Sequence, residues 1–145
     1  MLKFFKNGQS EYIIVDDWLA WNDREDRPAF TCGGEDNNEF WPCIIEKAYA
    51  KLYGNYSNIE TGKIHLALGD MVDNGFPEMH DLRVVGKNLR VFANMMRKFY
   101  RSEAMLGAAS PTHEQGHDAK SANGIYQSHA YAILKVEDYN DIQLF

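Results

Sequence analysis

The stretch "NNEFWPCIIEKAYAKLYGNYSNIETG", residues Asn37 to Gly62, decides the fold, because here the spacing of the apolar residues becomes helical. These residues recur every three or four positions, at Trp41, Ile44, Ile45, Ala48 and Leu52. Asn38 is a suitable N-cap, Gly54 is a suitable C-cap, and Pro42 lies in or just after the first turn, where proline is tolerated best. The pattern predicts an amphipathic helix from Glu39 to Tyr53, with Trp41, Ile44, Ala48 and Leu52 facing the core.

The residues before this helix predict strands. "LKFFKNGQSEYIIV", residues 2–15, places two apolar runs around Asn7-Gly8, which is a strong hairpin signal. Charged residues then gather from Arg24 to Pro28 and predict a solvated turn. We expect a short strand from Ala29 to Cys32 after that turn.

The residues after the helix predict a second helix and further strands. Apolar spacing indicates a helix from Lys87 to Arg101, whereas residues 54–86 carry scattered Gly, Asn and Pro and predict loops and short elements. "EAMLGAAS", residues 103–110, predicts a buried strand. "QSHAYAILKVEDYNDIQLF", residues 127–145, predicts two strands around a turn at Asp138 to Asp141. The order of strands, helix, helix and strands favours an α+β fold with an antiparallel β-sheet and at least two helices.

Length and composition limit the function classes. The chain has 145 residues, the size of one domain, and 45% of them are hydrophobic, which excludes a disordered chain. Its net charge of −6 argues against nucleic acid and anionic membranes as partners. No apolar run has the length of a membrane span, and the two cysteines, Cys32 and Cys43, do not make a disulfide framework. We therefore expect an intracellular, cytoplasmic protein.

One short motif suggests zinc chemistry. His113-Glu114-Gln115-Gly116-His117 has the pattern H-E-x-x-H, in which one face of a helix presents two histidines to a metal ion. Pro111 before the motif and Gly116 within it disfavour that helix, and the possible third ligands are His65 and His80. His65 and His80 do not lie in a recognisable ligand pattern. The stretch favours an exposed loop and no metal site, and a zinc metalloprotease is kept as a remote alternative.

The helical stretch also carries a family resemblance. It resembles a segment of calpains, the calcium-dependent cysteine proteases, written EFW-x-x-x-x-EKAYAK-x-x-G-x-Y. The matching residues are Glu39, Phe40, Trp41, Glu46, Lys47, Ala48, Tyr49, Ala50, Lys51, Gly54 and Tyr56. Looser matches cover almost the whole chain: "YIIVDDWLAW" at 12–21, "GDMVDNGFPEMHDL" at 69–82 and "SEAMLGAAS" at 102–110. "SHAYAI" at 128–133 is similar to the family's G-H-A-Y-S-V.

The resemblance implies a papain-like fold and identifies His129 as the catalytic histidine of a cysteine endopeptidase acting on protein substrates. A cysteine nucleophile acts as a thiolate, so it needs a neighbouring imidazole to take its proton. The loop from Thr112 to Gln127 would line and gate the substrate cleft, together with Ser128. Ser128 stands where the family motif has glycine, and its side chain would crowd the substrate backbone there.

Two family motifs have no counterpart in the sequence. The nucleophile's Q-x-x-x-G-x-C-W and the asparagine's N-P-W-G do not occur, and neither Cys32 nor Cys43 has the nucleophile's surroundings. Residues 1–145 are therefore interpreted as part of a calpain catalytic domain, its histidine-bearing lobe, with the cysteine-bearing lobe as the missing partner. We expect it to be inactive alone and to hold no cofactor, with calcium implied for the full-length protein. The alternative is a non-catalytic calpain-like binding or regulatory module.

Overall fold

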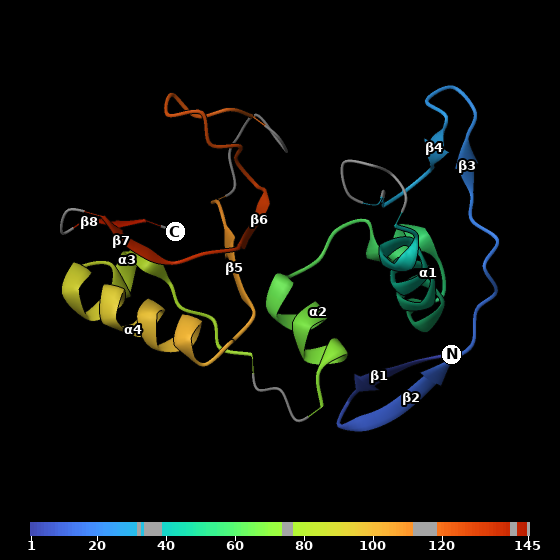
Figure 1. Ribbon diagram of the computed structural model, residues 1–145, viewed down its shortest axis with the longest axis horizontal. Helices are drawn as coiled ribbons and strands as arrows, with labels where there is room; N and C mark the ends of the chain where they lie inside the picture. Colours follow the sequence, from blue (N-terminus) through green and yellow to red (C-terminus); the bar gives the residue numbers. More distant parts are fainter. Residues whose placement is uncertain (32, 34–38, 74–76, 112–118, 140–141, 145) are drawn as a thin grey trace. The chain divides into compact units, whose positions relative to one another are not determined.

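The computed structural model describes residues 1–31, 33, 39–73, 77–111, 119–139 and 142–144 (Figure 1). The chain divides into two compact units. Unit 1 comprises Met1–Lys63 and Gly69–Gly75, and unit 2 comprises Ile64–Leu68 and Phe76–Phe145. His129 therefore belongs to unit 2, whereas the stretch from Asn37 to Gly62 belongs to unit 1.

Unit 1 is built from two hairpins and helices. Its elements are β1 (Leu2–Lys6), β2 (Gln9–Ile13), β3 (Trp21–Asn22), β4 (Arg27–Pro28), α1 (Trp41–Tyr53) and the 3-10 helix η1 (Tyr56–Ile59). Helix α2 (Ile64–Met71) contributes its first residues to unit 2 and its last ones to unit 1.

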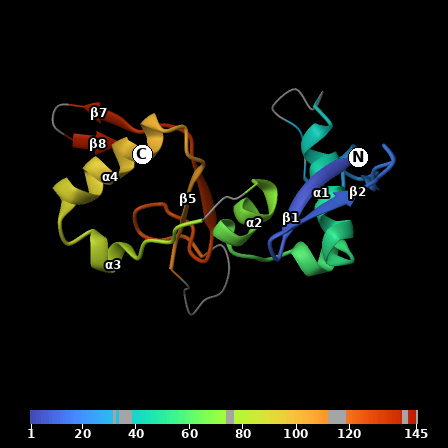
Figure 2. The ribbon, with the colours of Figure 1, turned by 90° about the horizontal axis from the view of Figure 1, so that it is seen from below.

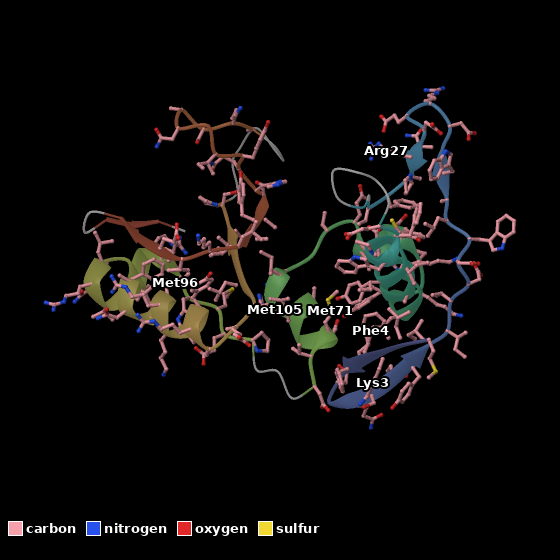
Figure 3. All side chains as sticks on the ribbon, in the orientation of Figure 1. Lys3, Phe4, Arg27, Met71, Met96 and Met105 are labelled. Carbon is pink, nitrogen blue, oxygen red and sulfur yellow. The ribbon has the colours of Figure 1, made fainter. Side chains whose placement is uncertain are left out.

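The hairpin predicted around Asn7-Gly8 is confirmed. Strands β1 and β2 pair antiparallel from Leu2↔Ile13 to Lys6↔Gln9. Asn7 and Gly8 both have positive φ, 54° and 75°, as a two-residue turn matching the twist of its strands requires. Phe4 is buried and points from β1 toward α1 (Figure 3), where its ring lies 5.8 Å from that of Tyr49.

Helix α1 confirms the predicted helix, but its buried face differs from the prediction. Cys43, Ala48 and Ala50 are buried, whereas Ile44 and Leu52 are only half-buried. The prediction that Trp41 faces the core is wrong, because its side chain is 62% exposed and its indole N–H donates to the Glu39 carboxylate. Small residues face inward, since β1 and the chain around Thr31 approach this side of the helix closely.

The predicted capping residue of α1 is found at the C-terminus of the helix. Gly54 caps the C-terminus with φ of 102°, a left-handed conformation that glycine adopts without strain, so this prediction is confirmed. At the N-terminus Phe40 is the capping residue and proline occupies the first turn. Asn38, the predicted N-cap, lies outside the described residues.

The strand predicted from Ala29 to Cys32 is wrong for Ala29 to Thr31, and Cys32 lies outside the described residues. The strand lies just earlier, where β4 pairs with β3 and the charged residues between them form the turn. Thr31 instead bonds to α1: its N–H donates to the Glu46 carboxylate at 2.9 Å, and its C=O accepts from Cys43 Sγ at 2.8 Å. These contacts to helix side chains replace the hydrogen bonds of a strand.

Unit 2 contains the remaining elements: α3 (Leu82–Val85), α4 (Leu89–Arg101), β5 (Leu106–Ala109), β6 (Ala130–Ile133), β7 (Glu137–Tyr139) and β8 (Ile142–Leu144). Helix α4 confirms the second predicted helix. Strand β5 is also confirmed, although it is half-buried on one face only. The C-terminal segment forms three strands where two were predicted, because β6 pairs with β5 and leaves β7 to pair with β8.

The α+β prediction is confirmed, with a difference in the sheets. The described strands form four antiparallel pairs instead of one continuous sheet. Both views of unit 2 show β7 and β8 alongside α4 (Figures 1 and 2), and Met96 of α4 is buried, as is Val136 just before β7. In the described part of the chain, no helix has the length and apolar character that a membrane span needs.

Candidate active site

His129 lies directly before β6, with its side chain exposed. Its backbone is bonded to Ser110, the residue that follows β5. The Ser110 N–H donates to the His129 carbonyl at 2.9 Å, and the His129 N–H donates to the Ser110 hydroxyl oxygen at 2.9 Å. The same hydroxyl lies 3.2 Å from the His129 carbonyl oxygen, to which it donates. The backbone that carries the imidazole is therefore held from the neighbouring strand end.

Ser128, the residue before the histidine, has an unusual backbone. Its φ is +53°, in the left-handed region that favours glycine, and its N–H donates to the Pro111 carbonyl at 2.9 Å. A glycine in the similar motif G-H-A-Y-S-V fits this conformation without strain. Ser128 adopts this left-handed conformation, so the backbone turns into β6 as it would with a glycine. The serine adds a half-buried hydroxymethyl group at this turn.

Two tyrosines border the imidazole. The Tyr131 ring meets the His129 ring edge-on with centroids 5.0 Å apart, and the Tyr126 ring lies at 6.0 Å. The Tyr131 hydroxyl accepts from the Tyr126 N–H at 2.9 Å, which ties the two aromatic residues together. The sequence argument missed both residues. Strand alternation was the available signal for Tyr131, since side chains at i and i+2 share a face.

The described part of the predicted cleft loop is an ordered turn. Lys120 and Tyr126 form an isolated antiparallel bridge, and the Ser121 N–H donates to the Ile125 carbonyl at 2.8 Å. Gln127, one of the predicted cleft residues, donates its N–H to the Ala119 carbonyl at 2.8 Å. Thr112 lies outside the described residues, as do His113, Glu114 and His117 of the zinc-type motif.

An open groove of about 760 Å³ lies against the β5–β6 pair. Its lining includes Met105 and the first two residues of β5, all of β6 with Leu134 after it, and Ile64 and Leu68 of α2. His129 itself does not line the groove, but its ring meets the ring of Tyr131, which does. Most of these side chains are apolar, which suits an apolar side chain or an extended peptide better than a charged ligand.

Residues that could hold a metal ion do not gather in the described part of the chain, where no three His, Cys, Asp or Glu side chains form a suitable group. His65 is half-buried on α2. His80 is exposed and lies 3.1 Å from the Glu78 carboxylate. The described residues thus do not fit a calcium or zinc centre of their own.

The one thiol among the described residues has a structural environment. Cys43 is 3% exposed, and its Sγ donates to the Thr31 carbonyl from inside unit 1. A nucleophilic thiol needs partial exposure, and the burial of Cys43 does not provide it. Cys32 lies outside the described residues.

The residues of the EKAYAK segment hold unit 1 together. The Lys47 ammonium bonds to the Asp16 carboxylate and the Trp18 carbonyl, both at 2.5 Å, and the Lys51 ammonium bonds to the Ile14 carbonyl at 2.8 Å. The Lys47 hydrogen bond lowers the pKa of Asp16. These lysines therefore fasten the extended segment after β2 to α1.

The tyrosines of α1 bind an aspartate at the end of α2. The Asp70 Oδ2 accepts from the Tyr49 hydroxyl at 2.9 Å and from the Tyr53 hydroxyl at 2.5 Å. Burial raises the pKa of Tyr49, with Tyr53 and Asp70 adding to the effect, and the Asp70 hydrogen bond raises the pKa of Tyr53. The Lys6 ammonium lies 3.7 Å over the Tyr53 ring. The cluster joins β1, α1 and the end of α2.

Comparison with known proteins agrees with this pattern. Residues 1–144 match the family described as "Calpain family cysteine protease". The calpain-type cysteine protease DEK1 of Zea mays is 34% identical over 99% of this chain and 7% of its own length. Calpain clp-1 of Caenorhabditis elegans is 32% identical over 90% of this chain and 16% of its own. Calpain-8 of Rattus norvegicus is 27% identical over 95% of this chain and 19% of its own length.

The match therefore extends along nearly the whole chain, although the chain spans less than a fifth of the length of these three relatives. It includes the α1 segment, whose residues hold unit 1 together, and the segment around His129. On this evidence the chain belongs to the calpain family of cysteine proteases.

Proposed function

We propose that this chain supplies the catalytic histidine of a calpain-type cysteine endopeptidase, and one wall of its substrate cleft. The observation that carries the proposal is the position of His129. It is exposed, it stands beside an apolar groove, and its backbone is fixed by hydrogen bonds to a neighbouring strand end. A general base needs a defined position and access to the substrate, and this geometry offers both.

The reaction is peptide hydrolysis through a thioester. The His129 imidazole takes the proton of a cysteine thiol, and the thiolate attacks the scissile carbonyl carbon. As the C–N bond breaks, the imidazolium gives its proton to the leaving amine. The imidazole then takes a proton from water, whose oxygen attacks the thioester, so the C–S bond breaks and the thiol is regenerated.

The thiol comes from outside the residues described here, since Cys43 is buried in unit 1. We assign it to the cysteine-bearing lobe, the partner of this chain in the complete protease, and expect the chain alone to be inactive. Thr112, Gln127 and Ser128 line and gate the cleft in this proposal. Gln127 and Ser128 support it by their position, directly before His129 in the chain.

The substrates are proteins, and the setting is the cytoplasm. Calcium acts on the complete protein at sites outside the described residues, which do not themselves form a metal-binding group. The chain's own contribution requires no bound cofactor, because proton transfer and thiolate stabilisation use the imidazole alone.

The test uses the complete protease that carries this chain. His129→Ala should abolish hydrolysis of casein in the presence of calcium. His80→Ala is the matched control, because His80 is also an exposed histidine of unit 2, and this variant should retain full turnover. Normal turnover by His129→Ala would refute the proposal. Turnover by the isolated chain would refute its inactivity, and loss of that turnover with a zinc chelator would favour the H-E-Q-G-H motif.

A non-catalytic binding or regulatory module is the second candidate, and Ser128 is the observation that favours it. Its side chain occupies a place where the family motif has glycine, next to the proposed catalytic residue. The two candidates differ in the rest of the protein. An upstream cysteine in the nucleophile's motif and a downstream asparagine in N-P-W-G support the enzyme, and their replacement supports the module.

A further inference from the structure

We infer that Ser110 is a positioning residue for His129, acting through its side-chain hydroxyl on the backbone that carries the imidazole. The inference rests on the proposed function, because it gives Ser110 a part in the same reaction. Ser110 does not touch the reacting atoms in this scheme. Its effect is to fix where the chain enters β6.

The strand register shows why a hydroxyl matters at this position. The β5–β6 ladder runs from Leu106↔Ile133 to Ala109↔Ala130, where both strands end. The next two residues, Ser110 and His129, still face each other across the pair. One contact between them is a backbone bond, from the Ser110 N–H to the His129 carbonyl at 2.9 Å. The Ser110 hydroxyl then extends the pairing beyond the last ladder position.

The hydroxyl meets both polar groups of the His129 backbone. Its oxygen accepts from the His129 N–H at 2.9 Å and donates to the His129 carbonyl at 3.2 Å. A serine hydroxyl has one donor and two acceptor positions, so it can make both bonds at once. Alanine makes neither, and a thiol in the same place makes both only weakly.

The next residue pair continues this attachment. The Ser128 N–H donates to the Pro111 carbonyl at 2.9 Å, while Ser128 holds a left-handed φ of +53°. Two consecutive residues after β5 therefore hold the two residues before β6. The left-handed turn is disfavoured for a non-glycine residue, so these contacts oppose its relaxation. If the Ser110 hydroxyl is lost, the backbone at His129 loses two of its restraints next to a strained residue.

Catalysis by His129 is sensitive to such a loss. The direction of a side chain follows from its backbone, and proton transfer requires the imidazole within hydrogen-bond reach of the thiol and the leaving group. A misplacement of about 1 Å can cost about 100-fold in rate. Substrate binding along the groove is much less sensitive, because neither His129 nor Ser110 lines the groove. The loss should therefore appear in kcat and leave KM largely unchanged.

The test compares three substitutions in the complete protease with calcium and a peptide substrate. Ser110→Ala removes the hydroxyl, Ser110→Cys keeps its shape with a weak hydrogen-bonding group, and Ser110→Thr keeps the hydroxyl. We expect Ser110→Ala and Ser110→Cys to lower kcat about 10- to 100-fold with KM within about twofold, and Ser110→Thr to keep kcat within about threefold. Ser102→Ala is the matched control and should keep wild-type kcat. It removes a comparable serine contact, the 2.9 Å bond from the Ser102 hydroxyl to the Phe99 carbonyl, in the same unit.

Three results would overturn the inference. Wild-type kcat in both Ser110→Ala and Ser110→Cys would show that the hydroxyl has no part in catalysis. Equal losses of kcat in Ser110→Cys and Ser110→Thr would show that the volume of the side chain matters instead of its hydrogen bonds. If Ser110→Ala does not fold, the comparison of Ser110→Cys with Ser110→Thr still tests the inference, since Ser110→Cys preserves the packing. Turnover by His129→Ala would overturn the proposed function as well, whereas an inactive His129→Ala with normal Ser110 variants would overturn the positioning role alone.

Discussion

The backbone angle φ of Ser128 influences the position of His129, the next residue in the chain. A φ of +53° is disfavoured for serine, yet it turns the chain from the loop into β6 and brings His129 beside the groove. The motif G-H-A-Y-S-V has glycine at this place, so the angle gives a backbone reason for that residue. Serine retains the angle at a cost in strain, and its N–H bond to Pro111 helps to maintain it.

Substitutions at residue 128 should therefore rank by their tolerance of a left-handed backbone. Ser128→Gly should change the free energy of unfolding by no more than about 1 kcal/mol, because relief of strain is offset by the entropy of an unfolded glycine. Ser128→Val should be about 1–2 kcal/mol less stable than Ser128→Gly, since a branched side chain fits this region poorly. Urea unfolding of the three proteins measures the order. A valine variant as stable as the glycine variant would contradict it.

Sequence alone nominated His129 as the catalytic histidine, but it gave no sign of the contacts that hold its backbone. The histidine was identified from a short motif, and its exposure and position are compatible with the assigned role. The contacts from Ser110 depend on strand register between segments 19 positions apart, and no local pattern carries that information. The angle at Ser128 is also a product of the tertiary contacts around it.

At the scale of elements, α1 organises unit 1. Its basic side chains fasten the segment after β2, its Glu46 and Cys43 hold Thr31, and its tyrosines bind Asp70. Apolar periodicity predicted where this helix lies to within two residues at its start. It did not predict the buried face, because the closest packing involves Ala48 and Ala50, while the much larger Trp41 remains exposed. Which face is buried depends on the partners that the helix meets.

The loss of stability caused by two substitutions on α1 should therefore not follow the size of the side chain that is replaced. Ala48 is fully buried, so Ala48→Leu should destabilise the chain by about 1–3 kcal/mol through overpacking. Trp41→Ala removes a far larger side chain but should cost only about 0.5 kcal/mol or less, as surface changes do. Thermal or urea unfolding gives both values. A larger loss in Trp41→Ala than in Ala48→Leu would show that the buried face has been assigned incorrectly.

The link between α1 and α2 should make stability depend on alkaline pH. The pKa values of Tyr49 and Tyr53 are raised in the folded state, so the folded chain retains their protons when the unfolded chain releases them. Unfolding then becomes more favourable as pH rises above about 10, the ordinary tyrosine pKa, and the stabilisation is fully present below that pH. Asp70→Ala should weaken this dependence, because it removes the carboxylate that both hydroxyls bind.

Tyrosinate absorbance near pH 11 provides the measurement. In the parent chain, Tyr49, Tyr53 and Tyr56 should titrate later than the exposed tyrosines, because the pKa of each is raised, and each of Tyr49→Phe and Tyr53→Phe should remove part of this late phase. Tyr12→Phe is the control, since Tyr12 is 58% exposed and its replacement should leave the late phase intact. A late phase whose amplitude is unchanged by both substitutions in α1 would contradict the assignment to this cluster.

At the scale of the whole molecule, the chain is two compact units with small cores. The buried apolar side chains of the described residues are Phe4, Cys43, Ala48, Ala50, Met96 and Val136. Large apolar residues such as Trp18 and Leu134 are more than 80% exposed. The sequence predicted the α+β class, the first hairpin, the two longest helices and β5, but not the division into units or the pairing of β5 with β6. Pairing of distant strands depends on register, which short-range patterns do not encode.

The central claim is that His129 is the imidazole that activates a cysteine thiol, and the reactivity of that thiol tests it most directly. The rate of alkylation by iodoacetamide is measured against pH in the complete protease, for the parent and for His129→Gln. We predict that the parent thiol stays reactive well below pH 8.5, the approximate pKa of a free cysteine, and that His129→Gln shifts the onset of reactivity up toward that value. Identical pH profiles for the two proteins would contradict the account.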